Sequence, residues 1–226
     1  IMPSDDFKDR ADAEREMTEI ADHIDDFDDD STLDDDRVDE HTDEEEKNTV
    51  TFASLGLPEE ILAAVTDMGF RVPTPIQAAA IPPLLELRDV VGIAQTGTGK
   101  TAAFGLPLLA IVDADERDVQ ALVLAPTREL AMQSAQAIED FAARTARLDV
   151  VPVYGGSPYG PQIGALKRGA QVVVGTPGRV IDLIEKGALD LSHVRMLVLD
   201  EADEMLRMGF AEDVETIASS APDDRL

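Results

Sequence analysis

The residues with the clearest chemical meaning form a glycine-rich run, AQTGTGKT, from Ala94 to Thr101. This run matches the phosphate-loop pattern, except that Ala94 stands where a first glycine is usual. Gly97 and Gly99 allow backbone angles that turn successive N–H groups inward around an anion, and the start of a following helix adds its positive dipole end. In such a loop Lys100 would meet the β and γ phosphates, and the Thr101 hydroxyl would ligate Mg²⁺. The residues predicted to hold the nucleotide in this loop are Ala94, Gln95, Thr96, Gly97, Thr98, Gly99, Lys100 and Thr101.

A group of carboxylates lies much further along the chain, at Asp200-Glu201-Ala202-Asp203, directly after four apolar residues. In a fold that already holds a triphosphate, Asp200 would bind Mg²⁺ through its water shell and Glu201 would orient and deprotonate the attacking water. The alternative is an acidic helix start that the helix dipole stabilises. The phosphate loop upstream favours hydrolysis, so we predict Lys100, Asp200 and Glu201 as the catalytic group.

Short valine-rich runs alternate with helical stretches through the second part of the chain. We expect strands at 89–94, 120–126, 148–154, 170–176 and 194–200, and helices at 55–70, 74–86, 101–112, 128–145, 159–169 and 178–187. Continuous apolar runs are typical of strands that are buried on both faces. The alternation therefore predicts an α/β fold with a mostly parallel sheet between helices, in which ligands bind beyond the carboxyl ends of the strands.

Charge divides the chain into two parts. Residues 1–47 contain 22 acidic and 5 basic residues, a net charge of −17, whereas residues 48–226 have a net charge of −11. A segment with so little to bury is predicted to be a disordered acidic tail, with a short helix within 11–24 as the main alternative. The chain has no cysteine, no secretory signal pattern and no apolar run of the roughly 18 residues that a membrane span needs. We therefore expect a cytoplasmic monomer that does not enter a membrane.

From about Phe52 to Asp224 the sequence resembles the DEAD-box RNA helicases, specifically their first RecA-like, ATP-binding domain. The segment FASLGLPEEILAAVTDMGFRVPTPIQ is similar to the adenine-recognition segment of that family. The resemblance implies ATP and Mg²⁺ as ligands, with Gln77 reading both edges of adenine, Phe52 packing on the base and Thr74 supporting the site.

Three more stretches resemble the elements of this family that contact RNA. The residues implied are Pro126, Thr127 and Arg128, the pair Gly155 and Gly156, and Thr176, Pro177, Gly178 and Arg179. Contacts of this kind go to the phosphate backbone, so RNA binding should be largely independent of base sequence. Because the folded part is acidic, such a surface must be a local basic patch.

The resemblance also shows departures. The family places a Ser-Ala-Thr segment and a second RecA-like domain beyond the point where this chain ends, at Leu226. Asp203, which in the family couples the domains through that segment, is therefore expected to lack its partner, and the fragment alone is expected to be inactive. The expected function is ATP-dependent, sequence-independent remodelling of RNA duplexes by the full-length protein. The alternatives are a non-catalytic nucleotide- or RNA-binding fragment, and an unrelated phosphate-loop ATPase, against which the adenine segment and TPGR argue.

Overall fold

The structure, a computed structural model, describes residues 50–95, 97–144 and 148–226. The predicted acidic tail and Thr96 of the phosphate loop lie outside the described residues. The disorder of the tail and its boundary at residue 47 therefore stay predictions.

The centre of the fold is a parallel sheet of four short strands in the order β2-β3-β1-β4. The strands are β1 (Ala121–Leu124), β2 (Val150–Val153), β3 (Val172–Gly175) and β4 (Met196–Leu199). Leu122 of β1 lies between Val173 of β3 and Leu197 of β4, so the three strands run in register. The two inner strands are buried along their whole length, as expected for a sheet covered on both faces. Four of the five predicted strands and the α/β class are thus confirmed.

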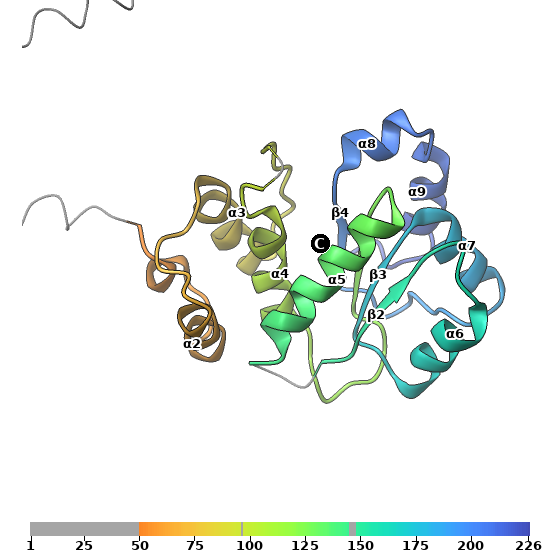
Figure 1. The fold of residues 1–226 in the computed structure, drawn as a ribbon, viewed down its shortest axis with the longest axis horizontal. Helices are drawn as coiled ribbons and strands as arrows, with labels where there is room; N and C mark the ends of the chain where they lie inside the picture. Colours follow the sequence, from red (N-terminus) through yellow and green to blue (C-terminus); the bar gives the residue numbers. More distant parts are fainter. Residues whose placement is uncertain (1–49, 96, 145–147) are drawn as a thin grey trace, which may run out of the picture. The chain divides into compact units, whose positions relative to one another are not determined.

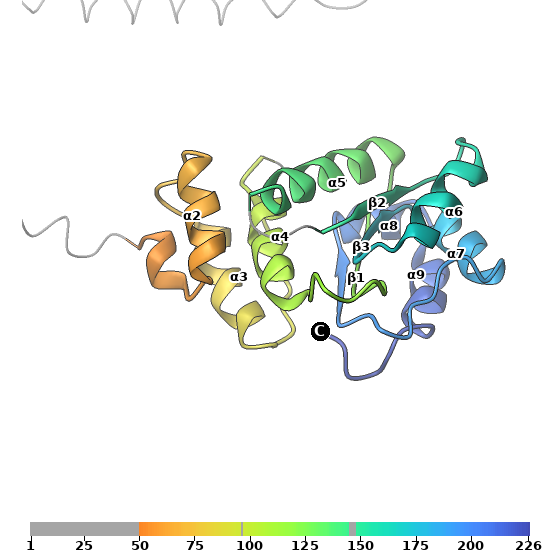
Figure 2. The same ribbon diagram turned by 90° about the horizontal axis from the view of Figure 1, so that it is seen from below.

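Helices cover both faces of this sheet (Figures 1 and 2). The described helical elements are η2 (Phe52–Leu55), α2 (Glu59–Asp67), α3 (Pro75–Leu85), α4 (Lys100–Ile111), α5 (Arg128–Ala142), α6 (Tyr159–Arg168), α7 (Pro177–Glu185), α8 (Ala202–Arg207) and α9 (Ala211–Ala218). Figure 2 shows α4 and α5 on one side of the strands and α6, α7 and α9 on the other. The six helices predicted from sequence are all present, with bounds that are shortened or shifted by a few residues, and η2, α8 and α9 were not predicted.

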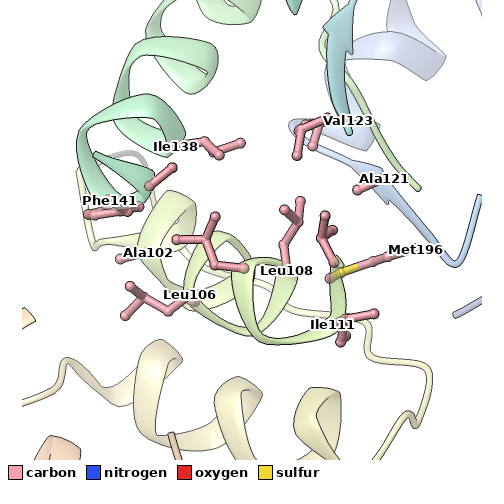
Figure 3. Close-up of a cluster of buried hydrophobic side chains, with 14 of the residues drawn as sticks. Ala102, Leu106, Leu108, Ile111, Ala121, Val123, Ile138, Phe141 and Met196 are labelled. Carbon is pink, nitrogen blue, oxygen red and sulfur yellow. The ribbon is translucent and has the colours of Figure 1, made fainter. Parts of the chain in front are cut away.

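The core alternates across the sheet with the period of two that strands impose. Ala121 and Val123 belong to the cluster that contains Leu108 of α4 and Ile138 of α5, and Figure 3 shows these side chains facing one another. Leu122, between them in sequence, belongs to the opposite cluster with α6, α7 and α9. The sheet is therefore packed on both faces.

The strand expected at residues 89–94 is absent, so that prediction was wrong. This segment has no regular secondary structure, and the Val91 and Ile93 side chains are 95% and 94% exposed. A strand needs a neighbour that accepts and donates its backbone hydrogen bonds, and no described residue pairs with this segment. The outer edge of β4 pairs, in the described residues, only with Leu226, which accepts from Leu197 N–H and donates to Arg195 O, both at 2.9 Å.

None of the helices in the described ranges combines the length and the apolar character that a membrane crossing requires.

The exposure of residues 89–94 can be tested by thiol labelling, because the chain has no native cysteine. We expect Val91→Cys to react with a maleimide at nearly the rate of a free thiol, since this side chain is 95% exposed. Val123→Cys, at a fully buried position of β1, is the matched control and should react only on unfolding. Equal protection of the two thiols would show that residues 89–94 are packed as a strand.

Candidate functional site

The glycine-rich loop leads directly into α4, whose first residue is Lys100. Gly97 and Gly99 have φ of 82° and 87°, in the region that side chains disfavour. At Gly99 space is a second constraint, because a Cβ there would lie 2.4 Å from Nε2 of Gln77. Thr98 closes the loop by donating its hydroxyl to Gln95 O at 2.7 Å. The loop therefore has the glycine geometry of an anion site at a helix start, although the predicted strand before it is missing.

Gln77 is buried, with 2% of its surface exposed, and it links α3 to the phosphate loop. Its Oε1 accepts a hydrogen bond from Thr74 N–H at 2.9 Å, and its Nε2 donates to Gly99 O at 3.2 Å. An amide has a second N–H and a second lone pair, so both functions can make one further bond. Sequence reasoning proposed contacts to adenine here and missed the bond to Gly99.

The aromatic residue proposed to pack on the base lies in the core. Phe52 is 3% exposed, and its ring meets that of Phe70 edge to face with the centroids 6.4 Å apart. Phe70 is the more exposed of the two, and it contacts Phe141 of α5 in the same way. Thr74 is the N-cap of α3 and forms a capping box with Gln77, and its hydroxyl is buried beside the Gln77 backbone N–H. Thr74 thus supports the start of α3.

Lys100 and Glu201 form an ion pair, although 101 positions separate them in sequence. Lys100 Nζ donates to Glu201 Oε1 at 2.8 Å, and both side chains are about four-fifths buried. Glu201 has φ 54° and ψ 47°, a left-handed conformation that costs a residue with a side chain on the order of 1 to 3 kcal/mol. This backbone turns the chain between the end of β4 and α8. The predicted phosphate ligand and the predicted general base thus lie together.

Asp200 follows β4 and is 9% exposed. Its Oδ2 accepts a hydrogen bond from Ser134 Oγ at 3.1 Å. Burial raises the pKa of Asp200 above its ordinary value, and the negative charge of Glu201 acts in the same direction, while Ser134 and Lys100 oppose the shift. A cation nearby would stabilise the charged form, so the site suits a carboxylate that works beside a metal ion.

Thr101 and Asp200 are the ligands predicted for Mg²⁺. A Mg²⁺ ion that bridges phosphates is usually held by one or two protein oxygens and several waters. The described residues contain no group of three or more acidic, histidine or cysteine side chains that could hold a metal by themselves. A hydroxyl and a buried carboxylate therefore fit an ion that shares its shell with substrate and water, and not a dedicated protein cage.

Asp203, which is expected to lack its family partner in the Ser-Ala-Thr segment, pairs with another residue of α8. Arg207, one turn further along α8, donates from Nη2 to Asp203 Oδ2 at 3.1 Å and also pairs with Glu204. The i,i+4 spacing on a helix explains the pairing. Because Arg207 and Asp203 are both about two-thirds exposed, the pair contributes little to stability.

The stretches proposed to contact RNA all lie just after strands. Thr127 caps α5 by accepting from Leu130 N–H, and Arg128 begins that helix with its side chain exposed. Gly155 and Gly156 follow β2 and are exposed. Pro126, Pro177 and Arg179 are buried, Thr176 precedes α7 as its cap residue, and Gly178 is exposed. Since the strands are parallel, these stretches and Asp200 share one edge of the sheet.

A surface hollow of about 510 Å³ runs along β2 and α6, next to the Gly155-Gly156 pair. Tyr154, Ser157 and Arg168 are among the residues that line it. It is distinct from the phosphate loop, and its wall mixes backbone of the edge strand with polar side chains.

Sequence reasoning missed Ser134, the hydrogen-bond donor to Asp200. Ser134 occupies the buried stripe of α5 together with Ala131, Ala135 and Ile138. A hydroxyl within an otherwise apolar stripe indicates a buried polar partner, so this residue could have been found from the helical period.

Comparison with known proteins agrees with the family resemblance found in the sequence. A sequence model of the family described as DEAD/DEAH box helicase matches residues 74–225. The chain is 58% identical over 175 residues to ATP-dependent RNA helicase DeaD of Haemophilus influenzae, and 57% identical over 176 residues to that of Mycobacterium tuberculosis. These alignments cover 77% and 78% of this chain but only 28% and 31% of the relatives, so the chain spans less than a third of their length.

Solved structures are similar as well. The crystal structure of a DEAD box protein from Methanococcus jannaschii superposes with a TM-score of 0.74 at 45% identity, over 77% of this chain and 48% of that one. A hypothetical ATP-dependent RNA helicase from Sulfolobus tokodaii gives a TM-score of 0.68 at 41% identity, over 75% and 48% of the two chains.

The raised pKa of Asp200 predicts a pH-dependent stability. In the metal-free chain the buried charge destabilises the fold at neutral pH, so Asp200→Asn should raise the midpoint of thermal unfolding, by about 2 to 4 °C for each kcal/mol recovered. This increase in the unfolding midpoint should shrink as the pH is lowered to 4, because the Asp200 carboxyl of the wild type is then protonated and neutral as well. The measurement is thermal unfolding from pH 4 to 8 in EDTA.

Asp118→Asn serves as the control, because Asp118 is an exposed carboxylate before β1. A lower midpoint for Asp200→Asn across the whole pH range would show that the carboxylate stabilises the fold, contrary to this reasoning.

Proposed function

The chain belongs to the DEAD/DEAH box helicase family, and from this premise we propose that it is the ATP-binding domain of an ATP-dependent RNA helicase. The observation that carries the proposal is the ion pair between Lys100 and Glu201. It joins the phosphate loop to the carboxylates after β4, as hydrolysis of a bound triphosphate requires.

The ion pair suggests how binding prepares the chemistry. Lys100 and Glu201 neutralise each other at 2.8 Å in a partly buried site. An incoming triphosphate brings more negative charge than one carboxylate, and the helix start at Lys100 favours anions. Lys100 would therefore exchange Glu201 for phosphate oxygens. Glu201, released from its partner, would become free to orient the attacking water and accept its proton.

Asp200 and Thr101 would hold Mg²⁺, which when bound neutralises developing phosphate charge. The contribution of the chain is to keep the Asp200 carboxylate in place, through its hydrogen bond from Ser134 on α5. Because α5 begins at Arg128, the helix that supports Asp200 also carries a residue proposed to contact RNA. One rigid element thus connects the two proposed sites.

RNA is proposed as the partner on two grounds. Relatives at 57–58% identity are named ATP-dependent RNA helicases. The stretches after β1, β2 and β3 share the sheet edge with the phosphate loop, and they offer helix starts, glycine backbone and an exposed arginine. Such groups bind phosphate without reading bases, so we propose sequence-independent binding of the RNA backbone. We further propose that the protein acts in the cytoplasm, since a chain without cysteine suits a reducing compartment.

The first test separates binding from hydrolysis. Lys100→Ala should weaken ATP binding at least tenfold, because a charged hydrogen bond in a partly buried site is worth about 1.5 to 3 kcal/mol. Glu201→Gln should bind ATP at least as tightly as the wild type, because Lys100 loses a competing partner, and in the full-length protein it should abolish hydrolysis. Calorimetric titration gives the affinities, and phosphate release gives turnover.

Glu204→Gln is the matched control, since Glu204 pairs with Arg207 and not with Lys100. Weakening of ATP binding by Glu201→Gln to the level of Lys100→Ala would contradict the exchange of partners.

A second test concerns the base. Gln77→Ala removes the bond to Gly99 and should weaken every nucleotide, but if the amide also recognises adenine, the ratio of ATP to GTP affinity should fall toward one. Gln136→Ala, on the exposed side of α5, should leave the ratio unchanged. An unchanged ratio in Gln77→Ala, with equal losses for both nucleotides, would restrict Gln77 to supporting the loop.

A further inference from the structure

The residues that directly precede three of the strands send their side chains to the C-terminal end of α4, the end away from the phosphate loop. Gln120 precedes β1, Gln171 precedes β3 and Arg195 precedes β4. Each donates to a backbone carbonyl of residues 111–116, where α4 ends and the loop to β1 begins. The C-terminal end of α4 is therefore held to the start of the sheet by polar contacts from three strands.

The two glutamines are buried and hold the loop that follows α4. Gln120 is fully buried, and its amide accepts from Asp113 N–H and donates to Asp113 O, both at 2.8 Å. Gln171 is 3% exposed, donates to Glu116 O at 2.6 Å and accepts from Asp149 N–H at 2.9 Å. A buried amide that pairs with backbone groups in this way replaces the partners of a strand, so the loop has a fixed shape.

Arg195 differs from the glutamines because it reaches the helix itself. Its Nη1 donates to the carbonyl of Ile111, the last residue of α4, at 2.7 Å. A cation at a helix C-terminus is favourable for the helix dipole, and the last turn of α4 has no basic residue of its own. Arg195 therefore supplies, from the start of β4, the cation that the end of α4 lacks.

Among the described residues, two polar contacts join α4 to β4 and the residues that flank it. The first is the ion pair of Lys100 with Glu201, at 2.8 Å, beside the phosphate loop. The second is the bond from Arg195 to Ile111 O at the opposite end. A helix of 12 residues is about 18 Å long, so the two contacts are well separated. Between them the elements meet through apolar side chains, among them Ile111 and Met196 (Figure 3).

Nucleotide binding would remove the first of these contacts. In the proposed mechanism Lys100 leaves Glu201 for phosphates that are then held at the start of α4, whereas Glu201, which activates the water, follows β4. Apolar packing is non-directional and keeps the two elements together without fixing how they slide along each other. A hydrogen bond fixes both direction and distance. With ATP bound, the bond from Arg195 is therefore the polar contact of the chain that keeps α4 and β4 in register.

We infer that Arg195 is a positioning residue for hydrolysis: by holding the end of α4 to the start of β4, it keeps Glu201 in register with a nucleotide bound at the start of α4. It does so from the opposite edge of the sheet, without touching the nucleotide. The inference rests on the proposed roles of Lys100 and Glu201.

The first test is steady-state ATP hydrolysis by the full-length protein with RNA. Arg195→Met keeps the length of the side chain but loses the bond to Ile111 O. It should lower kcat about tenfold and change the KM for ATP less than about twofold, because the groups that bind phosphate stay on α4 and only the placement of Glu201 is impaired. Arg195→Lys, which can still donate to that carbonyl, should restore most of the lost kcat.

Arg168→Met is the matched control. Arg168 is likewise exposed and donates to a carbonyl, but to Gly164 O of its own helix, so it joins no two elements. It should leave kcat and KM unchanged. Thermal unfolding of each variant, with hydrolysis measured well below the lowest midpoint, ensures that a lower kcat does not reflect unfolded protein.

A double-mutant cycle on the nucleotide-free 226-residue chain tests the link between the two contacts. Lys100→Met removes the contact beside the phosphate loop, and Arg195→Met removes the other one. Each single variant should lower the unfolding midpoint by about 2 to 4 °C. Substitutions so far apart normally have additive effects. If either contact alone keeps the elements in register, the double variant should lower the midpoint by clearly more than the sum of the single shifts.

The outcomes separate the inference from the proposed function. A wild-type full-length protein that hydrolyses no ATP would contradict the proposed function. In a wild type that does hydrolyse ATP, an unchanged kcat in Arg195→Met, with or without a raised KM, would overturn the inference and leave the proposed function standing. Additive shifts in the cycle would overturn it as well, because the two contacts would then act independently.

Discussion

Parallel strands that are buried on both faces restrict the functional residues of a chain to the loops at the strand ends. Every strand must be followed by a helix that returns across the sheet, so the loops after β1, β2, β3 and β4 gather at one edge. The stretches that begin at Pro126, Gly155, Thr176 and Asp200 all occupy those loops. Because these loops lie side by side, bound nucleotide and bound RNA would contact neighbouring ends of the same sheet. Binding of one could therefore affect binding of the other over a short distance.

Several charged side chains at that edge are paired or buried. The folded part is acidic overall, yet Lys100 is paired with Glu201, Asp200 is hydrogen-bonded by Ser134, and Arg179 is enclosed. Because the net charge of this part is negative, its field at long range opposes an approaching anion. A negative ligand can therefore bind only where exposed cations and helix starts outweigh that field locally.

Much of this could be predicted from sequence, and the exceptions have a common cause. The four strands, their helices and the pairing of the loop with the carboxylates follow from local patterns. Residues 89–94 have the same apolar pattern and yet form no strand, because a strand depends on its neighbour as much as on its own side chains. The inward orientation of Arg179 depends on a carbonyl of the turn, at Ser157, which no motif encodes. By contrast, the i,i+4 spacing of Asp203 and Arg207 was visible in the sequence and could have predicted their pairing.

The open side of β4 has a colloidal consequence. Apart from the bonds to Leu226, the backbone groups on the outer edge of β4 have no partner among the described residues, and Leu199 is 40% exposed there. Val91 and Ile93 add exposed apolar surface elsewhere. An uncovered strand edge is a template on which a second copy can pair, and such edges lead to aggregation unless charge keeps copies apart. A net charge of −28 opposes such contacts at low salt. Added salt would weaken that repulsion, so the acidic surplus should protect this exposed strand edge best at low salt.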